Sequence, residues 1–135
     1  MTTMVQQRSR PWLVLAAQFP AGALLGAALG YLGMLIGRTF FAGDSAGFGD
    51  IVASLGGIIL GFPLGAALGV SLVGWLVRRR QAVWATLIGS FLGSWSMFAL
   101  VQIFRNSEFL VAWGLFFLLG VLGAMLADWL AVGRR

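Results

Sequence analysis

The charged residues of this chain lie almost entirely outside four long apolar runs, and this separation limits the folds open to it. The runs extend over residues 12–37, 51–77, 82–104 and 108–132, and each exceeds the roughly 20 residues that a helix needs to cross a bilayer. The chain is 60% hydrophobic and 10% charged, whereas about a quarter of a soluble domain is charged. A soluble fold could not cover this much apolar surface. The sequence predicts an all-α membrane protein whose four transmembrane helices form two antiparallel hairpins.

The segments between the runs predict where the helices begin and end. Residues 1–10 are polar and form a predicted cytoplasmic tail, and residues 11–135 form one four-helix transmembrane domain. Pro11 suits the first turn of a helix, where a missing N–H loses no partner. Residues 38–50 have the glycines, serine and acids that are typical of a loop, and Asp50 is a predicted N-cap.

Arginine and tryptophan predict the same orientation. Seven of the nine basic residues fall on the side of the N-terminus, namely Arg8, Arg10, Arg78, Arg79, Arg80, Arg134 and Arg135. Four tryptophans fall on that side as well, namely Trp12, Trp75, Trp84 and Trp129. Cytoplasmic segments are enriched in basic residues, and tryptophan prefers the headgroup region. We therefore expect an integral protein of a bacterial-type plasma membrane with both termini in the cytoplasm.

An eight-residue stretch occurs once in the first apolar run and once in the second. Residues 19–26 and 62–69 both read Phe-Pro-x-Gly-Ala-x-Leu-Gly, and six of the eight positions agree. At about 100° per residue, the glycines of each run fall on one narrow stripe. Glycine permits the close backbone approach that holds helices together in lipid, so the two stripes are predicted to face each other. The predicted helix-packing residues are Gly22, Gly26, Gly30, Gly33, Gly57, Gly61, Gly65 and Gly69.

The third and fourth runs also carry small residues on one face each, in the half nearer the cytoplasm. On the third run these are Ala82, Ala85, Gly89, Gly93 and Ser96. On the fourth they are Gly120, Ala124, Ala127 and Ala131, with Gly123 at the edge. The outer half of the fourth face carries Trp113, Phe116 and Phe117. This pattern predicts close contact near the cytoplasm and splaying or aromatic filling toward the outside.

Asp128 is the acidic residue inside an apolar run, and it is a candidate polar site. An acid within a membrane is a functional hypothesis by default. The sequence leaves two interpretations open. Asp128 pairs with one of the arginines expected at the same level, namely Arg78, Arg79, Arg80 or Arg134. Alternatively, it handles an ion or a proton.

Pro20 and Pro63 are the other candidates for this site. Each removes a backbone donor, which frees the carbonyls of Ala16 and Ile59. One interpretation is a kink that improves packing. The other is a pair of broken helices that line a binding site, as in transporters built from related repeats.

Other polar residues of the runs give weaker signals. Gln18 and Gln102 are amides within predicted helices. Ser90, Ser94, Trp95 and Ser96 form a mildly polar belt, but they do not share one helix face and draw no pore line. The Trp95 indole N–H is expected to need a hydrogen-bond partner.

The composition excludes several function classes. The chain has no cysteine and no histidine, which removes thiolate chemistry and the usual zinc and haem ligand. No catalytic constellation is present, so we expect no enzyme, no cofactor and no bound metal. The arginines form no basic stripe, so nucleic acid is not an expected partner. We expect a structural or accessory subunit that packs against itself or a larger complex, with a small channel or transporter as the alternative.

Overall fold

The computed structural model describes residues 11–41, 47–78, 82–103 and 109–133, and these residues are helical apart from the positions at helix ends. The helices are α1 (Pro11–Phe41), α2 (Phe48–Arg78), α3 (Val83–Ile103) and α4 (Phe109–Gly133). All four are long and apolar enough to cross a membrane. The predicted all-helical fold with four helices of spanning length is therefore confirmed.

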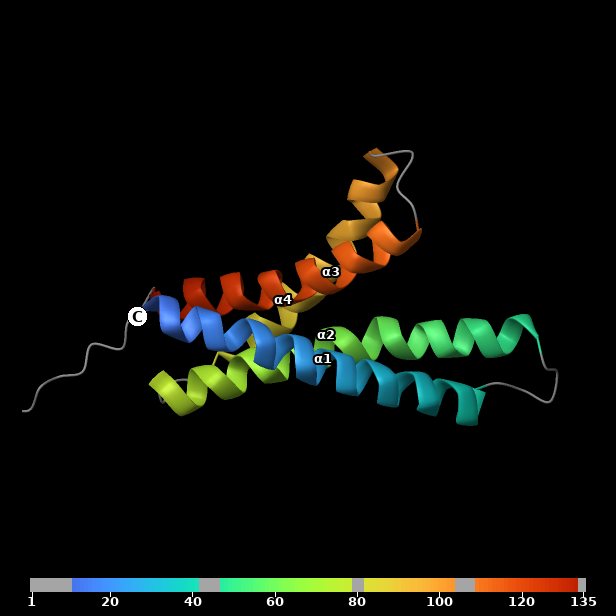
Figure 1. The fold of residues 1–135 in the computed structure, drawn as a ribbon, viewed down its shortest axis with the longest axis horizontal. Helices are drawn as coiled ribbons and strands as arrows, with labels where there is room; N and C mark the ends of the chain where they lie inside the picture. Colours follow the sequence, from blue (N-terminus) through green and yellow to red (C-terminus); the bar gives the residue numbers. More distant parts are fainter. Residues whose placement is uncertain (1–10, 42–46, 79–81, 104–108, 134–135) are drawn as a thin grey trace, which may run out of the picture.

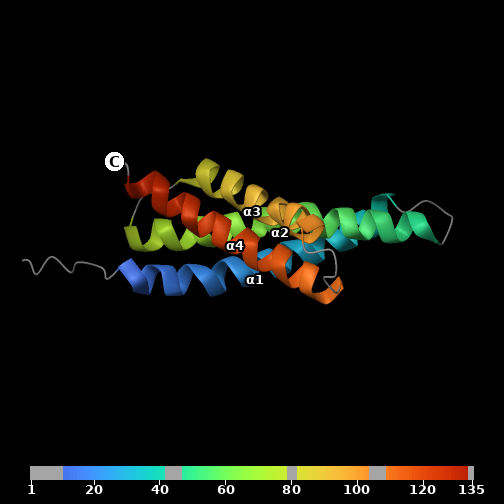
Figure 2. The same ribbon diagram turned by 90° about the horizontal axis from the view of Figure 1, so that it is seen from above.

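The helices are arranged as two antiparallel pairs (Figures 1 and 2). α1 lies along α2, and α3 lies along α4. We name the end where α1 begins and α4 ends the base, and the opposite ends of the two pairs the tips. The pairs contact each other toward the base and diverge toward the tips, as Figure 1 shows. α2 and α4 each contact all three other helices.

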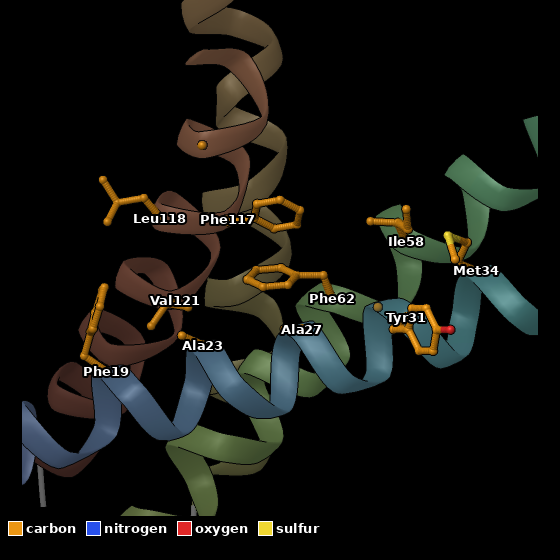
Figure 3. Close-up of a pocket in the computed structure, with 12 residues that line it drawn as sticks. Phe19, Ala23, Ala27, Tyr31, Met34, Ile58, Phe62, Phe117, Leu118 and Val121 are labelled. Atoms are coloured by element: carbon orange, nitrogen blue, oxygen red, sulfur yellow. The ribbon is translucent and has the colours of Figure 1, made fainter. Parts of the chain in front are cut away.

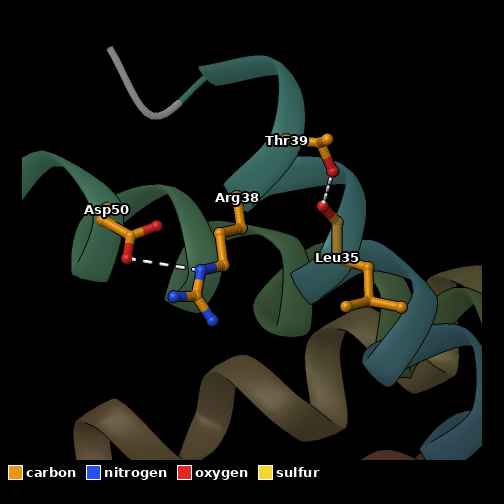
Figure 4. A network of polar contacts seen from close by, with 4 residues as sticks. All are labelled: Leu35, Arg38, Thr39 and Asp50. Carbon is orange, nitrogen blue, oxygen red and sulfur yellow. Dashed lines mark hydrogen bonds and ion pairs between the residues drawn. The ribbon is translucent and has the colours of Figure 1, made fainter. Parts of the chain in front are cut away.

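The α1–α2 hairpin is longer than the sequence predicts. α1 continues to Phe41 and α2 begins at Phe48, so each helix extends into the loop expected over residues 38–50. Polar contacts hold these added turns (Figure 4). The hydroxyl of Thr39 donates to the carbonyl of Leu35, and Arg38 Nε lies 3.4 Å from Asp50 Oδ2.

The start of α1 is as predicted and the start of α2 is not. α1 begins at Pro11. Asp50 is not the N-cap of α2, because the helix already begins at Phe48 and Asp50 lies in its first turn. The N–H of Asp50 donates to the carbonyl of Gly47 at 3.2 Å. A carboxylate in the first turn still interacts favourably with the helix dipole.

The core is centred on Phe62, and the outside of the molecule is apolar. Phe62 packs with Ala66, Met97, Phe116 and Val121. The rings of Phe62 and Phe116 are 6.0 Å apart. Large apolar side chains of all four helices point outward instead of into this core. Such a surface suits hydrocarbon as solvent, because water would not tolerate apolar patches of this extent.

Candidate functional site

The predicted packing glycines of α2 all lie against the backbone of α1. A Cβ added to any of them would collide with main-chain atoms of the neighbouring helix. The contacts join Gly57 to Gly33, Gly61 to Leu29, Gly65 to Leu25 and Gly69 to Ala21. These positions recur every fourth residue on each helix, so they form one continuous line along the hairpin, which we name the α1–α2 seam.

The predicted glycines of α1 have different neighbours. A Cβ on Gly22 would lie 3.1 Å from the Val70 side chain, and one on Gly26 would lie 2.7 Å from the Phe62 ring. A Cβ on Gly30 would lie 3.4 Å from Cβ of Phe62. Only Gly33 of the predicted set on α1 has its closest contacts with the backbone of α2. The predicted glycines of α1 and α2 therefore do not pair glycine against glycine along the whole seam, although Gly33 and Gly57 do.

The glycines of α3 and α4 show where these two helices approach each other closely. Gly89 lies against the backbone of Gly123 and the side chain of Ala127, and Gly93 lies against the backbone of Leu119. Gly120 lies against side chains instead, because a Cβ there would meet the Ser94 hydroxyl of α3 and lie 3.1 Å from the Phe62 ring of α2. Gly123, predicted at the edge of the α4 face, is at its centre.

The aromatic residues of α4 fill the space next to Phe62. The ring centroids of Trp113 and Phe116 are 5.7 Å apart, and those of Phe62 and Phe117 are 4.6 Å apart. The aromatic packing predicted for α4 therefore connects α4 to α2. The divergence toward the tips separates the two hairpins (Figure 1).

A buried polar core lies nearer the base and takes side chains from all four helices. Its members are Gln18, Ser71, Thr86, Ser90, Ser94 and Asp128. Gln18 is 0% exposed and Asp128 is 1% exposed. Gln18 Nε2 donates to Asp128 Oδ2 at 2.8 Å and approaches the carbonyl of Val70 at 3.5 Å. One amide therefore connects α1 to both α2 and α4.

Gly74 lies next to this amide and carboxylate. A Cβ at Gly74 would lie 3.5 Å from Asp128 Oδ1 and 3.7 Å from Gln18 Nε2. Both are ordinary van der Waals distances, so alanine would fit there, and Gly74 forms part of the wall around the polar pair. Gly74 was not singled out from the sequence, because it lies outside the four-residue glycine series.

The buried polar residues of α3 follow a four-residue spacing, which was not recognised in the sequence because Ser90 and Ser94 were grouped with Trp95 and Ser96. Thr86, Ser90 and Ser94 recur every fourth residue and are all buried, whereas Trp95 and Ser96 are exposed. The Ser71 and Thr86 hydroxyls are 2.6 Å apart. Within the described residues, Ser90 Oγ, Ser94 Oγ and Gln18 Oε1 are buried and have no hydrogen-bond partner. Trp95 packs on Phe98 at 5.6 Å.

The predicted arginine partner of Asp128 stays a prediction. Arg79, Arg80 and Arg134 lie outside the described residues, as does the side chain of Arg78. The Gln18 partner was missed, although depth could have identified it. Gln18 follows the first residue of α1 by seven positions, and Asp128 precedes the last residue of α4 by five.

The two prolines lie in different surroundings. Both α1 and α2 continue without interruption through Pro20 and Pro63. Pro63 is buried beside the core, whereas Pro20 is exposed. Because Ala21 lies against Gly69 and Pro63 is six positions earlier in α2, the prolines stand at different levels of the bundle. They do not meet at one site with Asp128.

Two grooves accompany the hairpins. The first, which we name the hairpin groove, has a volume of about 540 Å³ and lies between the α1–α2 pair and α4 (Figure 3). It is lined by Phe19, Ala23, Ala27, Gly30, Tyr31, Met34, Ile58, Phe62, Gly114, Phe117, Leu118 and Val121. Tyr31 supplies the one polar side chain of this lining. The hairpin groove therefore offers an almost wholly apolar surface.

The second, which we name the glycine groove, measures about 530 Å³ and lies over the α1–α2 seam. It is lined by Leu29, Leu32, Gly33, Ile36, Gly37, Ala53, Gly56, Gly57, Leu60, Gly61 and Leu64. Gly56 has open space where a Cβ would stand. The packing of this hairpin therefore does not account for glycine at position 56.

Neither metal chemistry nor similarity identifies the site. Over the part of the chain that the structure describes, no three His, Cys, Asp or Glu residues come together as a metal-binding group. No family model, curated protein or solved structure matches the chain.

Proposed function

We propose that the protein is a non-enzymatic, membrane-embedded structural subunit that acts through helix packing, with the glycine groove as its contact surface. The observation that carries this proposal is the open position of Gly56 beside Gly33, Gly57 and Gly61. In lipid, small residues mark the surfaces on which helix backbones approach closely. The leucines at the rim supply the ridges between which a partner helix would pack.

A second copy of this chain is the proposed occupant of the glycine groove. The part of the α1–α2 hairpin that carries the groove extends past α3 and α4 toward the tip (Figure 1), which leaves this face uncovered. A two-fold axis would place the same groove on both copies, and two-fold dimers are the commonest homo-oligomers. The small residues that line the groove on one copy would then meet those on the other.

The native mass in nanodiscs tests this proposal. The wild-type protein should have the mass of an oligomer, and Gly56→Ile should have the mass of one chain. Gly49→Ile is the matched control, because Gly49 also has open space around a Cβ and lines neither the glycine groove nor the hairpin groove. If the wild type has the mass of one chain, the glycine groove binds no second copy. If the wild type co-purifies with a different protein that Gly56→Ile releases, that protein is the occupant instead.

The α1–α2 seam is proposed to hold α1 and α2 together within one chain, as the glycine groove is proposed to hold two chains together. Its contacts are of backbone against backbone, and glycine loses no side-chain entropy when such contacts form. The seam would keep the hairpin straight enough to present the glycine groove.

The proposed orientation keeps both termini in the cytoplasm. Trp12, Trp75, Trp84 and Trp129 are all exposed near the base, which suits rings at a headgroup interface. Because the chain has no cysteine, Gly47→Cys gives a unique label position at the α1–α2 tip. A membrane-impermeant maleimide should label it from outside intact cells, and labelling only after lysis would reverse the orientation.

A small channel or transporter is the second candidate, and the polar core is the observation that favours it. Gln18 Oε1, Ser90 Oγ and Ser94 Oγ are buried without partners in the described structure. Unpartnered polar groups in a core are costly and call for a functional explanation. If they belong to a path, purified protein in liposomes should pass an ion or small solute, and Asp128→Asn should abolish the flux. The structural proposal expects no flux in either protein.

A further inference from the structure

The hairpin groove is distinct from the proposed glycine groove and needs its own occupant. Its floor is a strip of small residues on α1, namely Ala23, Ala27 and Gly30. Phe117, Leu118 and Val121 of α4 form one wall. We propose that this groove binds one acyl chain of a phospholipid along its length, with Tyr31 at the headgroup end. The inference requires only that the helices lie in a bilayer, and it does not depend on the oligomeric state.

The size of the groove matches a hydrocarbon chain. Its lining on α1 runs from Phe19 to Met34, which is about 22 Å of helix at about 1.5 Å per residue. A volume of about 540 Å³ spread over that length gives a mean cross-section of about 25 Å². Apolar groups touch at about 4.5 Å, so one extended chain fills about 20 Å². A helix about 10 Å in diameter would need about 80 Å², so only a ridge of it could enter.

The walls also favour a chain over a helix. Close helix approach needs small residues on both surfaces. The hairpin groove has a strip of them on α1, whereas the α4 wall offers Gly114 alone beside the larger Phe117, Leu118 and Val121. Phe117 stands over Phe62 at the inner side, with ring centroids 4.6 Å apart (Figure 3). These rings narrow the groove to a slot that still admits methylene groups.

An apolar space at this depth would not stay empty in a membrane. Atoms that line a void lose their dispersion contacts outright, and no water is available in hydrocarbon to fill it. Tyr31 gives the slot a direction. It lies toward the tip-side end of the lining, one helical turn before Met34 (Figure 3), and is largely exposed. Tyrosine prefers membrane interfaces because its ring is apolar and its hydroxyl is polar, so the hydroxyl suits an ester or phosphate group.

Filling the slot tests the proposal without disturbing the packed core. Ala27 lines the groove and is exposed, so Ala27→Phe can occupy the slot and still fold. Ala28 is the matched control, because it is also exposed and lines neither groove. The probe is palmitoyl-oleoyl phosphatidylglycerol in nanodiscs. Each protein is then transferred to detergent, and the bound lipid is counted by native mass spectrometry.

The wild type and Ala28→Phe should retain about one lipid per chain. Ala27→Phe should retain about tenfold less, because losing contact with a few methylene groups already changes affinity by that factor. Tyr31→Phe should reduce retention about threefold while leaving the slot open, since a net hydrogen bond is worth about that much. Equal retention by Ala27→Phe and Ala28→Phe would overturn the proposal. A change of oligomeric mass in Ala27→Phe with unchanged lipid would make a partner helix the occupant.

The lipid proposal and the oligomer proposal fail in different ways. Gly56→Ile should change the oligomeric mass and keep the lipid, whereas Ala27→Phe should lose the lipid and keep the mass. If Gly56→Ile instead released the lipid, the slot would depend on the second copy, and the single-chain lipid site proposed above would be wrong.

Discussion

The two copies of the eight-residue repeat have nearly the same sequence and different surroundings. Phe62 is 3% exposed at the centre of the core, whereas Phe19 is 39% exposed at the edge of the hairpin groove. Pro63 is buried and Pro20 is exposed. The difference follows from the position of the helices, because α2 contacts three neighbours and α1 contacts two. A repeated sequence therefore does not imply a repeated role.

The glycines of the repeat show the same asymmetry in finer detail. In the α2 copy, Gly65 and Gly69 lie against backbone atoms of α1. In the α1 copy, the corresponding Gly22 and Gly26 face the side chains of Val70 and Phe62. Side chains can move to other rotamers, whereas a helix backbone moves only as a unit. Substitutions at matched positions should therefore separate rigid contacts from adaptable ones.

Gly65→Ala against Gly22→Ala is the strongest test of this difference. A Cβ at Gly65 would lie 2.7 Å from Cα of Gly26 and closer still to the carbonyl of Leu25. Relief requires α1 to move away along the seam, so the loss should exceed the roughly 1–3 kcal/mol usual for overpacking. Gly22→Ala should cost about 1 kcal/mol or less. Thermal unfolding in a mild detergent measures both, and equal losses would mean that the two copies pack alike.

Phe62→Ala against Phe19→Ala should give the next largest difference. Removing the Phe62 ring leaves a cavity against Phe116 and Gly120 and should cost about 3 kcal/mol. Phe19→Ala changes a ring that lipid can replace, so about 0.5 kcal/mol or less is expected. Denaturation with increasing SDS compares the two variants. A larger loss of stability for Phe19→Ala would show that the edge of the hairpin groove contributes more to stability than the core does.

The residues directly before the two copies differ, because Gln18 precedes the first and Gly61 precedes the second. Gln18→Leu tests the contribution of this amide. Gln18 donates to Asp128 at 2.8 Å, and its loss removes a link between α1 and α4. Hydrogen bonds between membrane helices are worth about 0.6 to 2 kcal/mol, so a loss in that range is expected. Gln102→Leu is the control, because Gln102 is an exposed amide. An unchanged unfolding temperature for Gln18→Leu would show that this link adds nothing to the association of the hairpins.

The number of helices and the minimum length of each follow from features that the sequence displays directly. Long apolar runs and Pro11 need no tertiary information, and the helix dimensions imply spans of this length. The additional turns at Phe41 and Phe48 could not be predicted, because they depend on a contact across the hairpin between Arg38 and Asp50. Local composition indicated a loop there, and the pairing of the two helices outweighed it.

The site was harder to predict because it depends on which helices meet. Asp128 could be identified from its charge alone, but its contact with Gln18 requires α4 to lie against α1. The Thr86–Ser90–Ser94 series was visible as a four-residue spacing, and the neighbouring Trp95 and Ser96 concealed it. The divergence of the hairpins, and with it the hairpin groove, could not be predicted from one helix, because it depends on how α4 packs against α2, where the Phe62 and Phe117 rings meet.

The smallest expected effect concerns the prolines, and here the two copies should differ in sign. Proline inside a helix removes a donor and costs up to about 3 kcal/mol relative to alanine. Pro20 is exposed, so Pro20→Ala returns an N–H to the helix and loses no packing. Because α1 is already continuous around Pro20, only part of that cost is recovered, and stability should rise by about 0.5 kcal/mol.

Pro63 is fully buried beside the core. Pro63→Ala gains the same donor but leaves a small cavity, and each buried methylene lost costs about 0.8 kcal/mol. Two buried methylenes are lost, which outweighs the gain of about 0.5 kcal/mol, so stability should fall by about 1 kcal/mol. Hydrogen exchange at the backbone amide that each substitution introduces, alongside the unfolding temperature, separates the terms. Stabilisation by both variants would show that the core tolerates the cavity at Pro63 and that the copies differ less than their burial indicates.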